Sequence, residues 1–315
     1  MKLTKLILGT AAIGGLGHLA AKGIADKLQR NPDPWQLSEL LHPTPGDEVV
    51  VERDDGTLLH SKVAGDGPTV MLAHGYGFNL GEWNLVAERL VAGGRRVITF
   101  DQRGHGRSTI GAEGLGSPQM AGDYAAVLEH HGVRDAVLVG HSMGTFLSMK
   151  FCLQHPDIAR DRLKGMVLVS PLAGKANEGA PQNQLQIPLI KVGAFDAIIR
   201  NPVYGSLMGA TLFGTPAPSM VEGFRTLFLE QNHGRLVAAL DMLVHEDLYP
   251  RLGEIEVPTS VICGTKDRTT PTHHARQVAD GIDGADLTWV PGAGHCLNWE
   301  AVDELIELIE KRLTA

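Results

Sequence analysis

Three side chains of the kinds that cooperate in nucleophilic catalysis occur along this chain in the order Ser142, Asp267 and His295. A serine hydroxyl is a weak nucleophile at neutral pH, so it needs a base that removes its proton and a third group that orients this base. A histidine supplies such a base, and a carboxylate holds its imidazole in the required tautomer. These residue types predict acyl transfer through a covalent intermediate on Ser142.

Ser142 stands at the centre of the G-x-S-x-G pattern formed by residues 140–144. The apolar residues 136–139 predict a buried strand before this pattern, and residues 145–154 are compatible with a helix after it. A sharp turn from strand to helix lifts the serine hydroxyl above the edge of the sheet. The two flanking glycines lack the Cβ atoms that would collide where the helix crosses back over the strand. The pattern therefore predicts a nucleophile elbow.

Asp267 and His295 each follow a predicted strand of their own. Residues 259–263 and 287–290 predict buried strands, and the two candidates lie in the loops that come directly afterwards. Open α/β sheets place their chemistry beyond the carboxyl ends of the strands. We therefore expect both side chains to meet Ser142 at one edge of a sheet. No carboxylate occurs at residues 171–175, directly after the strand that ends at Ser170, and the alternative acids upstream of Asp267 are Glu246 and Asp247.

From about residue 48 to the C-terminus the sequence resembles the α/β-hydrolase family. Residues 70–73 predict a strand that ends in an HGxG motif at residues 74–77, and residues 101–108 match the family's D-x-R-G-x-G-x-S turn. The resemblance implies an α/β-hydrolase fold, with a mostly parallel central sheet flanked by helices and a helical cap inserted before the last strands. It also implies that the backbone N–H groups of Tyr76 and Met143 form an oxyanion hole. His74 and Arg103 are then structural residues.

The chain divides into three predicted regions. Residues 1–45 form an anchor-like leader and a Pro-rich linker, residues 46–171 and 253–315 form the hydrolase core, and residues 172–252 form the helical cap. Roughly 80 residues between two strands of one sheet are too many for a plain loop. The cap is rich in apolar and aromatic side chains. Its candidates for contact with substrate are Phe195, Leu207 and Phe213.

The leader allows several interpretations. Lys2 and Lys5 precede a glycine-rich, uncharged run over residues 6–21, as at the start of a signal peptide or membrane anchor. This run is shorter than the roughly 20 residues that span a bilayer. Export, weak membrane association and a cytoplasmic location therefore all stay open. The run also holds a G-x-G-x-x-A pattern, but Trp35 stands where a dinucleotide site requires an acidic residue, and we expect no nucleotide cofactor.

Composition excludes other classes of function. A length of 315 residues with 43% hydrophobic content fits a globular protein, and a formal net charge of −8 offers no basic surface for nucleic acid. Cys152, Cys263 and Cys296 show no metal-type spacing, so we expect free thiols and no metal site. The expected partner is a small-molecule ester, and the sequence predicts no oligomeric state.

The predicted activity is that of a serine esterase or lipase without a cofactor. The apolar cap favours medium-chain acyl groups or monoacylglycerol-like lipids, because each buried CH₂ contributes about 0.8 kcal/mol. The same triad serves C–C bond hydrolases, thioesterases, lactonases and perhydrolases, and these alternatives stay open. So does a ligand-binding receptor on a hydrolase scaffold. Serine at position 142, where dehalogenase and epoxide hydrolase relatives carry aspartate, argues against those two classes.

Overall fold

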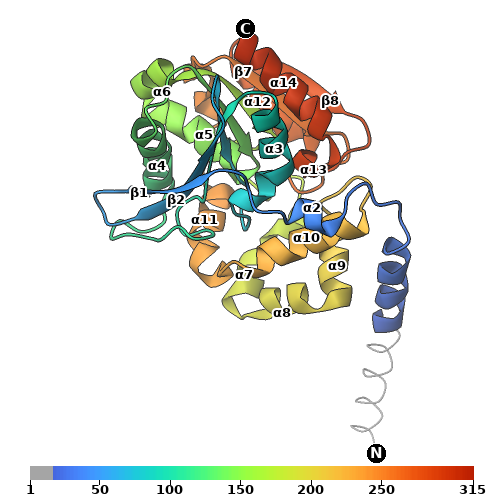
Figure 1. Cartoon of the computed structure of the whole chain (residues 1–315). Coiled ribbons are helices and arrows are strands. Elements are labelled where there is room, and N and C mark those ends of the chain that lie inside the picture. The colour runs from blue at the N-terminus through green and yellow to red at the C-terminus, as the bar shows by residue number, and fades with distance from the viewer. Residues whose placement is uncertain (1–16) are drawn as a thin grey trace, which may run out of the picture.

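A computed structural model describes residues 17–315 as an eight-stranded sheet with helices on both faces (Figure 1). The strands follow the order β1-β2-β4-β3-β5-β6-β7-β8 across the sheet. β2 runs antiparallel to both of its neighbours, and every pair from β4 to β8 is parallel. The strand bounds are β1 Asp47–Glu52, β2 Leu58–Ala64, β3 Thr69–Ala73, β4 Arg96–Phe100, β5 Ala136–His141, β6 Leu163–Val169, β7 Thr259–Gly264 and β8 Asp286–Val290. The predicted α/β-hydrolase fold is confirmed.

The central strands are mostly apolar, and both of their faces are covered. Every residue of β3, β5 and β7 is buried, as expected of parallel strands between two layers of helices. Successive side chains point to opposite faces. Met71 and Leu138 therefore join the apolar core on one side of the sheet, whereas Val70 and Val139 join the core on the other side.

The helices of the hydrolase core divide between these two faces (Figure 1). Buried residues of α4 (Ser117–His130), α5 (Met143–Gln154) and α12 (Thr272–Gly281) pack in the core that contains Met71. Buried residues of α3 (Asn84–Ala92), α13 (Leu297–Glu300) and α14 (Val302–Thr314) pack in the core that contains Val70. The short helix α6 (Pro156–Arg162) connects α5 to β6.

Helices also fill the long insertion between β6 and β7, where the cap is expected. Those between residues 181 and 245 gather at one end of the sheet, beyond the carboxyl ends of its parallel strands (Figure 1). The last, at residues 249–254, packs instead in the core that contains Met71. An isolated bridge between Gly174 and Asp247 joins the beginning of this insertion to its end. The bounds are η2 Pro181–Leu185, α7 Gln186–Lys191, α8 Ala194–Arg200, α9 Pro202–Ala210, α10 Pro218–Leu229, α11 His233–His245 and η3 Tyr249–Glu254.

The segment that precedes the sheet is packed against the rest of the molecule. Residues 17–28 are helical, α2 spans Leu37–Leu40, and Leu40 is fully buried. The Asp33 carboxylate accepts the backbone N–H of Ser219 at 2.7 Å, and the indole N–H of Trp35 donates to the Trp299 carbonyl at 2.9 Å. The predicted Pro-rich linker is therefore attached to α10 and α13. Most of the predicted leader run lies outside the described residues.

Within residues 17–315, no helix has both the length and the apolar character needed to cross a membrane. A 3-10 turn, η1 (Leu80–Trp83), leads directly into α3. The side chain of Asn79 accepts the backbone N–H of Gly81 at 2.9 Å, which caps η1. η1 follows the HGxG motif, and its contacts with the site are described below.

Candidate active site

Ser142 occupies the turn between β5 and α5, as the G-x-S-x-G pattern predicts. Its backbone has φ 51° and ψ −114°, a region that non-glycine residues rarely adopt. Its N–H donates to the Val169 carbonyl at 3.0 Å, which attaches the turn to the end of β6. The surrounding chain thus holds Ser142 in a strained conformation at the edge of the sheet.

Asp267 and His295 meet in a buried hydrogen bond. Nδ1 of His295 lies 2.8 Å from Oδ2 of Asp267, and the two residues are 3% and 5% exposed. Burial raises the pKa of the Asp267 carboxyl, but His295 and the donors of Thr270 outweigh this effect, so the net shift is downward. Asp267 is therefore ionised at neutral pH and is suited to hold the Nδ1–H tautomer of the imidazole.

Thr270 belongs to this arrangement, although the sequence did not identify it. Its hydroxyl lies 2.9 Å from Oδ2 of Asp267, and its backbone N–H donates to Oδ1 at 3.0 Å. The N–H of Thr269 donates to the same Oδ1 at 2.9 Å. An aspartate that accepts N–H groups two and three residues further on forms a common local turn. The D-x-x-T pattern at residues 267–270 was the signal available in the sequence.

Ser142, Asp267 and His295 line a single cavity of about 670 Å³ between the sheet edge and the cap helices. The structure therefore brings the three predicted residues together across more than 150 positions of the chain. The loop that carries His295 is also bonded to the cap. The backbone N–H of His295 donates to the Leu212 carbonyl at 2.6 Å. The Glu300 carboxylate accepts the N–H group of Gly214 in the cap at 2.8 Å and that of Gly294 in the His295 loop at 2.7 Å.

The HGxG loop borders the same cavity through Gly75 and Tyr76. Met143 is the first residue of α5, where backbone N–H groups have no partner within the helix. His74 is fully buried, and its two ring nitrogens lie 2.7 Å from the Gly75 carbonyl oxygen and 2.9 Å from the Gln102 backbone nitrogen. Both nitrogens of His74 are thus occupied in holding loops, which agrees with the structural role expected for it.

The D-x-R-G-x-G-x-S turn connects loops around the site without lining the cavity. Arg103 donates to both carboxylate oxygens of Asp123, at 2.9 and 2.8 Å, and to the Gly114 carbonyl at 3.2 Å. It also forms an ion pair with Asp55 at 2.5 Å. Arg103 therefore ties neighbouring loops together, as expected.

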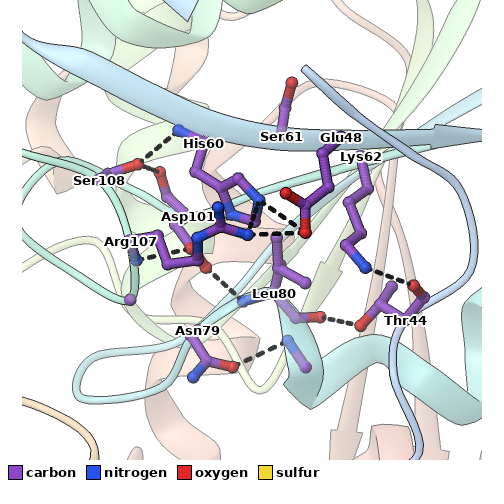
Figure 2. A network of polar contacts seen from close by, with 12 residues as sticks. Thr44, Glu48, His60, Ser61, Lys62, Asn79, Leu80, Asp101, Arg107 and Ser108 are labelled. Carbon is purple, nitrogen blue, oxygen red and sulfur yellow. Dashed lines mark hydrogen bonds and ion pairs between the residues drawn. The ribbon is translucent and has the colours of Figure 1, made fainter. Parts of the chain in front are cut away.

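Asp101, the first residue of this turn, is the centre of the network in Figure 2. Its carboxylate accepts the backbone N–H groups of Leu80 and Arg107, both at 2.8 Å, and lies 3.0 Å from Nδ1 of His60. The guanidinium of Arg107 reaches Glu48 at 2.6 Å. The network fixes the end of β4 to the beginning of η1, and so supports the chain that leaves the HGxG loop.

One of the three predicted contacts with substrate is on the cavity wall, and two are not. Phe195 lines the cavity. The ring of Phe213 instead stacks on Trp299 with centroids 6.1 Å apart. Leu207 is not among the residues that line the cavity, although its neighbour Met208 is. The apolar wall is formed by Phe78, Leu189, Phe195, Ile198, Met208, Leu212, Phe224, Phe228, Leu240 and Leu243.

The three cysteines are free and buried. Cys296, which follows His295, is 1% exposed, and burial raises the pKa of its thiol well above the usual value. It is therefore an un-ionised, unreactive neighbour of the site. In the part of the chain from residue 17 onward, no group of three or more His, Cys, Asp or Glu residues is arranged to hold a metal ion.

Comparison with known proteins identifies the family of the chain. Residues 68–302 match the model of the alpha/beta hydrolase fold family, and the chain belongs to that family. A non-heme haloperoxidase from Rhodococcus erythropolis is 29% identical, over 82% of this chain and 98% of its own. A 2-hydroxy-6-oxo-6-phenylhexa-2,4-dienoate hydrolase from Comamonas testosteroni is 28% identical, over 80% of this chain and 89% of its own.

Among solved structures, an esterase from Exiguobacterium antarcticum superposes with a TM-score of 0.75 at 23% identity, over 85% of this chain and 100% of its own. At this identity the likeness concerns the fold. Together with the family match, it places the protein among the hydrolases of the α/β-hydrolase superfamily.

Proposed function

We propose that the protein hydrolyses carboxylic esters through an acyl-enzyme on Ser142. The observation that carries this proposal is the Asp267–His295 hydrogen bond on the wall of the cavity that Ser142 also lines. His295 removes the proton from Ser142 as its oxygen attacks the acyl carbon, and Asp267 stabilises the imidazolium that forms. The protonated His295 then gives its proton to the leaving alcohol.

The backbone N–H groups of Tyr76 and Met143 are the proposed donors to the tetrahedral oxyanion. Both come from segments whose positions are fixed before substrate arrives, the HGxG loop and the N-terminus of α5. Donors of this kind stabilise charge that develops only in the transition state, and losing one lowers the rate on the order of 10²–10³-fold. Water activated by His295 then cleaves the acyl-enzyme, so the reaction uses residues of this chain and water alone.

The proposed substrate is an ester with an apolar acyl chain of medium length. The cap side of the cavity is lined by aromatic and aliphatic side chains, including Phe195, Phe224 and Phe228. Asn183 and Gln186, which carry polar side chains, also line the cavity. A cavity of about 670 Å³ with these two kinds of lining accommodates an acyl chain together with a small polar alcohol, as in a monoacylglycerol.

The test combines one variant with a series of substrates. Ser142→Ala is expected to abolish hydrolysis of p-nitrophenyl esters and labelling by a fluorophosphonate probe. Ser148→Ala is the matched control, because the Ser148 hydroxyl is buried in α5 and donates to the Gly144 carbonyl at 2.7 Å. Labelling of Ser142→Ala at another residue would overturn the assignment. With wild-type protein, kcat/KM is expected to rise from acetate towards esters of about six to ten carbons.

Cleavage of a C–C bond is the second candidate, because the relative from Comamonas testosteroni is named as a dienoate hydrolase. Thioester, lactone and perhydrolase chemistry use the same three residues. Fluorophosphonate labelling of Ser142 without turnover of any ester in the series would favour these reactions. Tight binding of esters without either labelling or turnover would favour a receptor.

A further inference from the structure

A carboxylate is buried directly behind the proposed catalytic residues. Glu82 lies in η1 and is 0% exposed. One of its oxygens, Oε2, accepts the backbone N–H of Gly75 at 2.8 Å, and the other, Oε1, forms an ion pair with Nδ1 of His141. Glu82 therefore contacts both the HGxG loop, one residue before Tyr76, and the nucleophile elbow, one residue before Ser142.

His141 extends these contacts to the third component of the site. It is 0% exposed, and its Nε2 lies 3.1 Å from the carbonyl oxygen of His295. The rings of His141 and His295 are close, with centroids 4.7 Å apart. A continuous path of polar contacts thus runs from the Gly75 N–H through Glu82 and His141 to the backbone of His295.

The main chain of Glu82 is also anchored. Its carbonyl accepts the side-chain N–H of Asn298 at 2.9 Å and the indole N–H of Trp299 at 3.1 Å, and both donors lie in α13. Glu82 is therefore bonded through both its main chain and its carboxylate to segments that surround the site. Its position does not depend on a bound substrate.

The chemistry of the pair fits a charged state. An unpaired carboxylate in a fully buried place is strongly destabilising, whereas a hydrogen-bonded ion pair offsets much of that penalty. Burial lowers the pKa of His141, but the Glu82 carboxylate outweighs this effect, so the net shift is upward. An imidazolium donates from both ring nitrogens, which satisfies Glu82 on one side and the His295 carbonyl on the other.

We propose that Glu82 and His141 are positioning residues, which hold the HGxG loop, the nucleophile elbow and the His295 loop in their reactive alignment. This inference rests on the proposed serine hydrolysis. Neither residue takes part in bond making. Their contacts fix the peptide units next to Tyr76 and Ser142, and errors of about 1 Å at such positions lower rates on the order of 10²-fold.

The variants Glu82→Gln and Glu82→Met separate this role from a general structural one. In Glu82→Gln, the amide oxygen still accepts the Gly75 N–H, and the amide N–H donates to Nδ1 of a neutral His141. All contacts of the path are kept, so kcat is expected to stay within a few-fold of wild type. Glu82→Met has a similar volume but keeps none of these bonds, and kcat is expected to fall about 10²-fold with KM little changed.

Glu88→Met is the matched control, since Glu88 lies on α3 with a side chain that is 44% exposed and forms an ion pair with His42. Thermal unfolding of all variants reports on general destabilisation. Loss of kcat in Glu82→Met with rescue by Glu82→Gln supports the proposal. Wild-type kcat in Glu82→Met, or an equal loss in Glu82→Gln, overturns it.

NMR spectroscopy tests the Glu82–His141 pair independently of ester turnover. Wild-type protein is expected to show two strongly hydrogen-bonded imidazole protons at low field in its NMR spectrum, from His295–Asp267 and His141–Glu82. Glu82→Gln removes only the second, because Nδ1 of a neutral His141 accepts. Absence of the second signal in the wild type would overturn the pair, whereas failure of ester hydrolysis with both signals present would overturn the proposed function alone.

Discussion

A Cβ atom on Gly140 would lie 2.6 Å from the carbonyl carbon of Gly144. The first turn of α5 therefore passes directly over the end of β5, which is the crossing predicted from the pattern around Ser142. Gly144 has a different neighbour: a Cβ atom there would meet the carbonyl oxygen of Ala73 in β3. Gly140 thus allows α5 to pass close to β5, and Gly144 allows α5 to pass close to β3.

Gly140→Ala is expected to lower the free energy of unfolding by about 1–3 kcal/mol, the usual effect of overpacking a dense interior. It is also expected to slow fluorophosphonate labelling, because the added methyl pushes α5 and Ser142 out of place. Urea titration and labelling kinetics measure the two effects. Gly23→Ala is the control, since nothing lies within 4 Å of a Cβ at that position. Unchanged stability and labelling in Gly140→Ala would contradict the prediction.

Asp267→Asn is expected to lower kcat on the order of 10⁴-fold, because an amide no longer stabilises the imidazolium or selects its tautomer. Glu246→Gln and Asp247→Asn are expected to keep near-wild-type kcat. Glu246 contacts Lys150 at 3.0 Å, and Asp247 contacts Lys175 at 2.8 Å. Steady-state kinetics of the three variants measure kcat. A large loss in either control with little loss in Asp267→Asn would move the acid to the control position.

Met208→Trp is expected to shift the preferred ester towards shorter acyl chains. Met208 lines the cavity and its neighbour Leu207 does not, so a bulky ring at position 208 occupies space that the acyl chain needs. Leu207→Trp is the matched control on the same helix. The ratio of kcat/KM for octanoate to that for acetate measures the shift. An equal change in both variants would show that the effect comes from the helix and not from the cavity.

Stability is expected to decrease as the pH falls from about 6.5 to about 4. Burial lowers the pKa of His274 to about 4, with a smaller contribution from His273, and burial likewise lowers the pKa of His131 to about 4. In this window the unfolded chain binds protons at both histidines and the folded protein does not, so protonation favours unfolding.

Urea titrations at about pH 7 and about pH 4.5 measure this dependence. His274→Gln is expected to show a smaller difference between the two pH values than wild type. An equally large difference in the variant would assign the acid sensitivity to other groups.

Deleting residues 1–30 is expected to leave a soluble, active protein, since β1 begins only at Asp47. Deleting residues 1–45 is expected to lower stability, because it removes the bonds of Asp33 and Trp35 and the buried side chain of Leu40. Thermal unfolding of the two truncated proteins compares them directly. Cell fractionation of full-length and shortened protein tests the leader. Full-length protein found wholly in the soluble cytosolic fraction would exclude both an anchor and export.

The parts of the site that were predictable are those encoded in short segments. Ser142, Asp267 and His295 each follow an apolar run that reads as a strand, so parallel topology alone brings them to one edge. The orientation of the cap helices was not predictable in this way. Phe213 and Leu207 are as apolar as Phe195, and only packing against Trp299 and the turn of α9 decides which side chains face the cavity.

Glu82 illustrates the same limit for a polar residue. A glutamate in a segment between two strands is ordinarily expected to be exposed to solvent. The burial of Glu82 depends on partners far away in the sequence. Gly75 lies in the preceding loop, but His141 and Trp299 lie 59 and 217 positions further along. No local sequence pattern predicts that these segments converge behind Ser142.

The bond from the His295 N–H to the Leu212 carbonyl joins a proposed catalytic loop to the end of α9 and its following turn. Gly214 and Gly294 pack backbone against backbone at the same junction. Chimeric proteins that exchange the whole cap of this chain for that of a relative would therefore also replace the backbone contacts that His295 and Gly294 make with residues 212–214. To keep His295 in position, such grafts have to retain the host residues 212–214 and place their splice points on either side of them.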